Sequence, residues 1–177
     1  MDFMYHVTEP INMEDLSHLL TDTCRKIKED KRWTSVSKII GEAVEDCVST
    51  MACPLCHEKT LIKYKMNEKS KDMTYETCHC HIQVKATKSS KKKTHSLKLL
   101  GAEYKTTSAS IKENDVHYLI VSYSVLQEIY TIHNIYFIDR TDVTECCIIP
   151  RKPLSSRAKR AGWQGCMLVC NTYRSLY

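Results

Sequence analysis

Apolar residues recur at helical spacing in two stretches near the start of the chain, and each stretch predicts an amphipathic helix. The apolar positions of the first stretch are Leu16, Leu19, Leu20, Cys24 and Ile27. Those of the second stretch are Val36, Ile39, Ile40, Ala43, Val44, Cys47, Val48 and Met51. Asn12, with Asp15 three residues later, is the expected N-cap of the first helix, and Thr34 or Ser35 that of the second. Cys24 and Cys47 fall on the apolar stripes, so we interpret both as buried thiols.

After the second helix, β-rich runs alternate with polar turns. The predicted strands cover residues 61–66, 73–77, 81–86, 116–123, 129–138 and, with a weaker pattern, 143–149. Residues 96–113 are predicted to be a helix with a sparse apolar face. Two helices followed by strands, a helix and further strands predict an α+β (mixed α/β) fold.

Composition limits the class of protein. The chain has 177 residues, of which 42% are hydrophobic and 27% charged, and this suits a single domain over residues 1–177. The apolar runs, such as residues 118–121, are far shorter than the roughly 18 residues of a membrane span. The N-terminus lacks the basic start and apolar stretch of a signal peptide. We therefore expect no membrane partner and an intracellular location, cytoplasmic in a prokaryotic or viral setting and nuclear otherwise.

Charge is spread unevenly along the chain. Residues 1–50 hold ten acidic and six basic side chains, for a net charge of −4. Residues 51–177 hold eleven acidic and twenty basic side chains, for a net charge of +9. A basic surface over the C-terminal two-thirds indicates a polyanionic partner such as nucleic acid.

The ten cysteines suggest metal ligands and buried thiols rather than disulfides. Cys53 and Cys56 form a C-x2-C knuckle, and Cys78 opens a second, irregular knuckle after a predicted hairpin. Two such knuckles predict a tetrahedral structural zinc site within an insertion of about 53–81. Cys53, Cys56 and Cys78 are its expected ligands, and the fourth is either Cys80 or His81.

A second constellation follows the knuckles. Gln83 and Lys85 share one face of a predicted strand, since side chains alternate along it. If the preceding turn centres on residues 79–80, Glu76 lies opposite Gln83 on the neighbouring strand, and Asp72 shares its face. An acid beside a QxK strand resembles the active site of PD-(D/E)xK nucleases, in which oxygen ligands hold Mg²⁺ and the lysine acts on the attacking water.

Further motifs resemble the DpnI family of restriction endonucleases. They are the CPLC knuckle, LGAEY at 100–104, RKPL at 151–154 and RAGWQGC at 160–166, and the similarity runs from about residue 45 to 166. The resemblance implies a PD-(D/E)xK core with an inserted zinc knuckle, a need for Mg²⁺ and cleavage of duplex DNA within a GATC-like site. Members of the family can carry a C-terminal winged helix, for which 177 residues leave no room.

The resemblance also assigns roles to residues. Cys53 and Cys56 match the first zinc knuckle and Lys85 the catalytic lysine, whereas Gln83 stands where the family has glutamate. The first acid is Asp72 in an ungapped alignment and Glu76 if the hairpin is shorter. A further carboxylate could come from the second helix, whose candidates are Glu42, Glu45 and Asp46.

Basic residues supply the expected DNA contacts. They are Lys91, Lys92 and Lys93 in a loop, and Arg151, Lys152, Arg157, Lys159 and Arg160 in a tail of about 150–177. Trp163, flanked by glycines, either reads bases or packs on the sheet.

The sequence thus predicts a sequence-specific, Mg²⁺-dependent DNA endonuclease with a structural zinc. Its alternatives are a non-catalytic zinc-containing DNA-binding module and a structure-selective nuclease. The oligomeric state and the effect of adenine methylation stay open.

Overall fold

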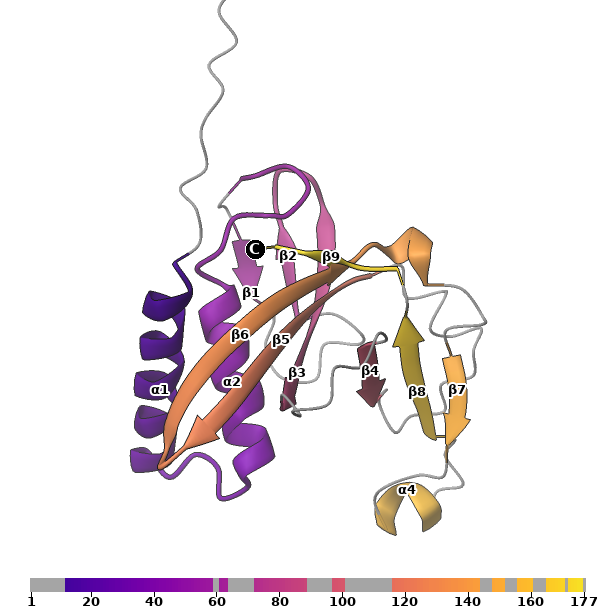
Figure 1. The fold of residues 1–177 in the computed structure, drawn as a ribbon. Coiled ribbons are helices and arrows are strands. Elements are labelled where there is room, and N and C mark those ends of the chain that lie inside the picture. Colours follow the sequence, from indigo (N-terminus) through magenta and orange to yellow (C-terminus); the bar gives the residue numbers. More distant parts are fainter. Residues whose placement is uncertain are drawn as a thin grey trace, which may run out of the picture.

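The computed structural model of the protein describes residues 12–58, 61–63, 72–88, 97–100, 116–143, 148–151, 156–160, 165–170 and 172–176. Within them, two long helices, α1 (Met13–Glu29) and α2 (Val36–Val48), precede a series of strands. The helices lie together against one side of a larger sheet, and a smaller sheet lies on the side away from them (Figure 1). The predicted α+β fold class is confirmed.

The larger sheet has six strands in the order β1-β2-β3-β5-β6-β9. Their bounds are β1 Leu61–Lys63, β2 Met73–Tyr75, β3 Cys80–Lys88, β5 His117–Leu126, β6 Ile129–Ile138 and β9 Arg174–Ser175. Strands β3 and β5 are parallel and the other neighbours are antiparallel. Strand β2 pairs only with the first three residues of β3, so β3 runs on past the end of β2.

The smaller sheet has the order β4-β8-β7, and both of its pairs are antiparallel. Its strands are β4 Leu97–Leu100, β7 Ile148–Arg151 and β8 Gly165–Cys170. Two short helices complete the described elements, η1 (Arg140–Asp142) after β6 and α4 (Ser156–Arg160) between β7 and β8.

Both long helices begin where the sequence predicts. The Asn12 side chain caps α1 by accepting hydrogen bonds from the backbone N–H groups of Glu14 and Asp15. Ser35 is the N-cap of α2, although its side chain makes no capping bond. The apolar stripes are buried except at their margins, where Leu19 is 37% and Val36 63% exposed.

The two helical cysteines are buried thiols, as predicted. Burial raises the pKa of Cys24 to about 11 and that of Cys47 to about 12. Both pKa values exceed the usual value near 9, so these thiols stay protonated and unreactive at neutral pH.

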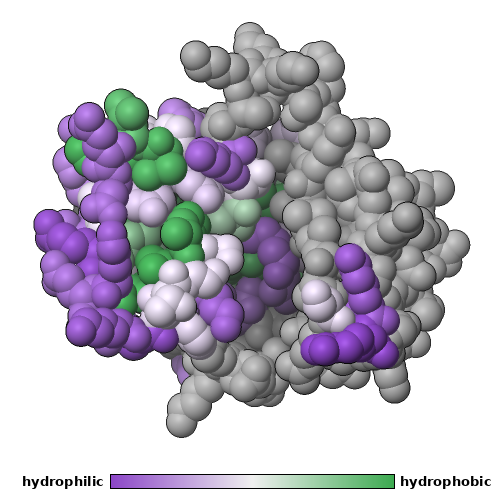
Figure 2. Space-filling model, turned by 90° about the horizontal axis from the view of Figure 1, so that it is seen from below, coloured by the Kyte–Doolittle hydropathy of each residue, from purple (hydrophilic) through white to green (hydrophobic). Residues whose placement is uncertain are grey.

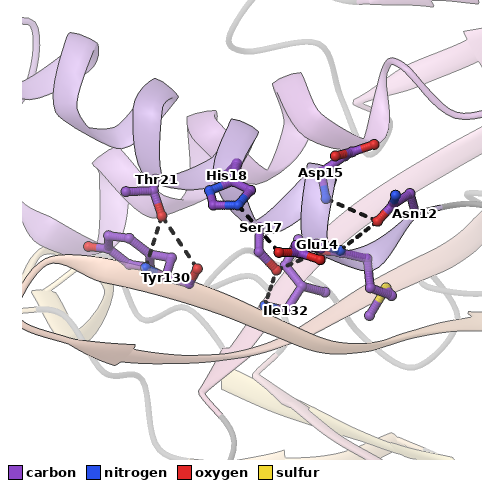
Figure 3. Close-up of polar contacts among 9 residues, drawn as sticks. Asn12, Glu14, Asp15, Ser17, His18, Thr21, Tyr130 and Ile132 are labelled. Atoms are coloured by element: carbon purple, nitrogen blue, oxygen red, sulfur yellow. Dashed lines mark hydrogen bonds and ion pairs between the residues drawn. The ribbon is translucent and has the colours of Figure 1, made fainter.

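Helix α1 also completes the edge of strand β6. Strand β9 pairs with β6 only at Tyr136 and Phe137. Farther along β6, the Thr21 hydroxyl accepts a hydrogen bond from the backbone N–H of Tyr130 and donates one to its carbonyl, at 3.0 and 3.3 Å. The Ser17 hydroxyl accepts one from the N–H of Ile132 at 2.9 Å (Figure 3). Side chains of a helix here take the place of a neighbouring strand.

One predicted element is wrong. Residues 97–100, expected in a helix, form strand β4, which pairs with β8 about 70 residues later in the chain. Pairing between distant segments outweighs a weak local helical pattern. Residues 96 and 101–113 of the predicted helix lie outside the described residues. Strand β2 ends at residue 75 rather than 77, whereas residues 64–66 and 144–147 of two other predicted strands lie outside the described residues.

Candidate functional site

The turn between β2 and β3 decides which acid lies beside Gln83. The strands pair Tyr75 with Cys80 and Met73 with Ile82, across a four-residue turn at 76–79. This turn lies two residues earlier than predicted, with His79 in the left-handed conformation at φ 53°. The predicted pairing of Glu76 with Gln83 is therefore wrong, and Glu76 lies exposed in the turn.

Asp72 takes the position beside Gln83. Its backbone N–H donates to the carbonyl of Ile82 at 2.9 Å, which extends the strand pairing by one residue. Its Oδ2 accepts a hydrogen bond from Gln83 Nε2 at 2.8 Å and another from the backbone N–H of Val84 at 2.7 Å. The carboxylate thus accepts a backbone hydrogen bond from β3 of the kind that a neighbouring strand would accept. These contacts hold the Asp72 side chain against β3.

A pocket of about 270 Å³ opens at this edge of β3. Asp72, Gln83 and Lys85 line one side, and residues of α2 line the other. Gln83 and Lys85 both point away from the core, whereas Val84 between them is buried. Glu45 of α2 also lines the pocket, so two acidic residues, a glutamine and a lysine lie around it together with apolar residues such as Ile40, Val44 and Tyr123.

Glu45 is distinguished from its acidic neighbours by the packing of α2. Glu42 accepts hydrogen bonds from Arg32 at 2.6 Å and from the Trp33 indole at 2.5 Å, and it is not among the pocket residues. Asp46 is not among them either. The helix periodicity alone could not choose among the three acids, because the choice depends on where β3 crosses the helix.

The two cysteine knuckles bring three thiols together. The Sγ atoms of Cys53, Cys56 and Cys78 lie within 4.8 Å of one another, and those of Cys53 and Cys78 are 3.5 Å apart. Zinc–sulfur bonds of about 2.3 Å in tetrahedral geometry place ligand sulfurs about 3.8 Å apart. The spacing and the donor type therefore fit a zinc ion.

The two candidates for a fourth ligand point in different directions. His81 Nδ1 lies 2.8 Å from the Thr74 hydroxyl, and the alternation of β3 puts Cys80 on the opposite face. Burial first, then a hydrogen bond with Cys78 and the neighbouring Cys53 thiol, raises the pKa of Cys80. Cys80 thus lies next to Cys78 and Cys53, although its sulfur is not one of the three that lie within 4.8 Å of one another.

The expected DNA-contacting residues are only partly described. Lys91, Lys92, Lys93, Lys152 and Trp163 lie outside the described residues, and Arg151 and Arg157 are described by backbone alone, in β7 and α4. Lys159 and Arg160 are exposed on α4.

Helix α4 lies at the lower end of the molecule (Figure 1). Seen from below, that end combines hydrophilic and apolar surface (Figure 2). The β5–β6 turn and the start of α2 lie at the same end (Figure 1). Leu126 and Ile129, which flank that turn, and Val36, the first residue of α2, are exposed apolar residues.

The fold and site define an α+β protein with a thiol cluster and a polar pocket at the open edge of a central strand. A family model described as DpnI, the Dam-replacing family, matches residues 24–173. The chain belongs to this family, and the resemblance seen in its sequence motifs is confirmed. Membership points to a restriction-type nuclease that acts on DNA.

Among the described residues, no helix combines the length and apolar character needed to cross a bilayer.

Proposed function

We propose that the protein is a Mg²⁺-dependent, sequence-specific endonuclease that hydrolyses phosphodiester bonds in duplex DNA at a GATC-like site. One observation carries the proposal: the carboxylate of Asp72 is fixed by Gln83 and Val84 in a pocket that it shares with Lys85 and Glu45. An acid next to a QxK strand matches the arrangement of a PD-(D/E)xK core, and Glu45 could add the helical carboxylate that some relatives have.

The roles follow from the chemistry of each group. Asp72 and Glu45 supply the carboxylate oxygens that Mg²⁺ prefers, and Asp72 rather than Glu76 is the proposed ligand from the hairpin. A bound Mg²⁺ would neutralise charge on the scissile phosphate. Lys85 orients the attacking water and offsets charge that builds up in the transition state. Gln83 holds Asp72 in place through its amide N–H and offers its carbonyl oxygen as a further Mg²⁺ ligand.

A structural zinc is the second proposed metal. Cys53, Cys56 and Cys78 would hold it, with Cys80 as the proposed fourth ligand, and the ion would join the end of α2 to the β2–β3 hairpin. Because that hairpin carries Asp72 and Gln83, the zinc fixes the segment on which the candidate catalytic residues lie. In this proposal residues 53–81 form an insertion in a single nuclease domain over residues 1–177.

DNA binding is assigned to the basic side chains. The proposed phosphate contacts are Lys159 and Arg160, together with Arg157 of the same helix α4, Arg151 of β7, and Lys152, Lys91, Lys92 and Lys93. Trp163 is the proposed base-contacting residue in the tail of about 150–177.

The proposed activity is tested by digesting plasmid DNA with Mg²⁺ and sequencing the ends. Plasmid with and without adenine methylation is compared, because the family leaves methyl dependence open for this chain. We expect defined ends at one short sequence, with no cleavage in EDTA or by Lys85→Ala. Absence of cleavage of both plasmids by folded, zinc-loaded protein would refute the proposal.

A non-catalytic DNA-binding module is the second candidate. It is favoured by Gln83, which removes one negative charge from the position where the family has glutamate. Such a protein would bind one duplex sequence tightly and leave it intact with Mg²⁺ or Mn²⁺. The same plasmid digestion, combined with a binding titration, separates the two functions.

A further inference from the structure

The pocket beside β3 has two walls of different character. One wall carries the candidate catalytic groups of Asp72, Gln83 and Lys85. The opposite wall is a face of α2, along which Ser37, Gly41 and Glu45 follow at intervals of one helical turn. The proposed chemistry gives a role to Glu45 but none to Ser37 and Gly41, which lie nearer the start of α2.

Gly41 is an unfavourable choice for its position in the helix. It lies in the interior of α2, where glycine lowers helix stability relative to alanine. Packing does not demand it either, because a Cβ added at Gly41 would meet no atom within 4 Å. What the absent side chain does provide is open space on the side of the helix that lines the pocket.

The size and polarity of the pocket limit what can fill that space. Its volume of about 270 Å³ is close to the lower end of ligand pockets, roughly 300 Å³, so it admits a single sugar–phosphate unit but not a duplex. A phosphodiester that reacts beside Asp72 and Lys85 has α2 on its other side. The face that contains Gly41 is therefore the side of α2 nearest to a strand attached to that phosphodiester.

We propose that Gly41 determines access to the site: its lack of a side chain keeps open the passage between α2 and β3 through which the backbone of the cleaved DNA strand reaches Asp72 and Lys85. This inference rests on the proposed nuclease function. A side chain larger than a methyl group at position 41 fills the passage while the core on the other face of α2 is undisturbed.

The test compares Gly41→Leu with Gly41→Ala in the full-length protein. Both residues favour helix, so both variants should melt at or above the wild-type temperature. Gly41→Ala should cleave duplex DNA within a few-fold of wild type. Gly41→Leu should cleave about 100-fold more slowly, because the phosphate no longer reaches the catalytic groups in register.

Binding supplies a readout that does not depend on cleavage. Each change is combined with Lys85→Ala, and affinity for a fluorescent cognate duplex is measured. Gly41→Leu should weaken binding about tenfold relative to Gly41→Ala, since a filled passage forces the strand out of contact. An unchanged melting temperature excludes misfolding as the cause.

The outcomes separate this inference from the proposed function. If wild type cleaves and Gly41→Leu cleaves and binds like Gly41→Ala, the strand takes another route and the inference is wrong. If wild type fails to cleave, the nuclease proposal is wrong. In that case the binding comparison still decides on Gly41: a selective loss in Gly41→Leu supports the passage, and equal binding rejects it.

Discussion

A single oxygen of Asp72 accepts two hydrogen bonds, one from the Gln83 amide and one from the Val84 backbone. A carboxylate held in this way keeps its orientation before any metal binds, which is the preorganisation that a catalytic site needs. Glutamate at position 83 could not donate the first of these bonds while ionised. Gln83 therefore fixes the orientation of Asp72, whereas the glutamate of the family pattern at this position would add a negative charge.

Removal of individual side chains should separate the proposed catalytic residues from their neighbours. Lys85→Ala and Asp72→Ala should each lower the cleavage rate at least about 100-fold, because each removes a group that acts on the transition state. Glu76→Ala should cleave like wild type, since Glu76 lies exposed in the turn. Cleavage rates are measured on cognate duplex DNA. As a control, the Lys85→Ala variant should still bind that duplex, which shows that its loss of activity is not a loss of binding. An active Asp72→Ala beside an inactive Glu76→Ala would reverse the assignment.

Substitution of Gln83 tests whether its amide donates to Asp72. Gln83→Glu brings two carboxylates into contact, so its melting temperature in EDTA should fall below that of wild type. Added Mg²⁺ should raise the melting temperature of Gln83→Glu more than that of wild type, because the cation screens the pair. Gln83→Met loses the hydrogen bond to Asp72 without adding charge. Its melting temperature should therefore also fall, but added Mg²⁺ should not raise it more than that of wild type. Equal Mg²⁺ responses in all three proteins would contradict this account.

The two long helices differ in how their N-termini are satisfied, and this gives a matched pair of variants. Asn12→Ala removes a side chain that accepts two backbone hydrogen bonds and should lower the free energy of unfolding by about 1 kcal/mol. Ser35→Ala at the same position of α2 should change it little, because that side chain makes no capping bond. Urea denaturation of both variants measures the difference, and equal losses would show that the capping bond of Asn12 is unimportant.

The short helix η1 provides a pH-dependent prediction. Burial raises the pKa of its N-cap Asp139, but hydrogen bonds from Thr141 and the nearby His117 and Arg140 lower it overall. A carboxyl with a lowered pKa stabilises the fold above the unfolded value of about 3.9 and loses that effect as pH falls through the folded value.

Asp139→Asn keeps a side-chain oxygen that can cap η1 but removes the charge. The stability difference from wild type should be constant above about pH 5 and shrink as pH falls below about 4. Denaturation across this range measures it. A difference that persists undiminished at the lowest pH would mean that the charge of Asp139 is not its source.

Local patterns predicted some elements well and others badly, for physical reasons. The stripes of α1 and α2 and the strand Ile129–Ile138 are long and strongly periodic, and they were predicted nearly to the residue. Strand β4 depends on pairing with β8, which no local pattern reveals.

The candidate site divides in the same way. The C-x2-C spacing of Cys53 and Cys56 is a local signal, so the sequence alone was enough to find it. The choice of Asp72 over Glu76 depends on the length of a turn, and the choice of Glu45 depends on how α2 crosses β3. Both choices needed the three-dimensional structure.

At the scale of the whole molecule, the thiol cluster joins parts that are distant in sequence. It links the end of α2 to the β2–β3 hairpin. From the C-terminal strand β9, Arg174 donates a hydrogen bond to the carbonyl of Pro54 at 2.8 Å and lies over the ring of Phe137 at 5.3 Å. A metal in this cluster would therefore hold both the start and the end of the sheet.

Removal of that metal should destabilise the entire domain. Elemental analysis should find about one zinc per chain, and a strong chelator should lower the melting temperature markedly. Cys53→Ser and Cys80→Ser should each lose zinc, whereas His81→Ala should retain it, because His81 faces Thr74. If His81→Ala loses zinc and Cys80→Ser retains it, the fourth ligand is His81 and not Cys80.

The contact between α1 and the edge of β6 has a consequence for the protein in concentrated solution. Backbone groups of Tyr130 and Ile132 bind the hydroxyls of Thr21 and Ser17, so a strand from another molecule finds no partner there. Exposed strand edges are templates for intermolecular pairing. If α1 detaches, that template is uncovered next to the apolar Ile129. The first step of aggregation should then be the loss of a helix, and α1 protects the molecule against its own copies.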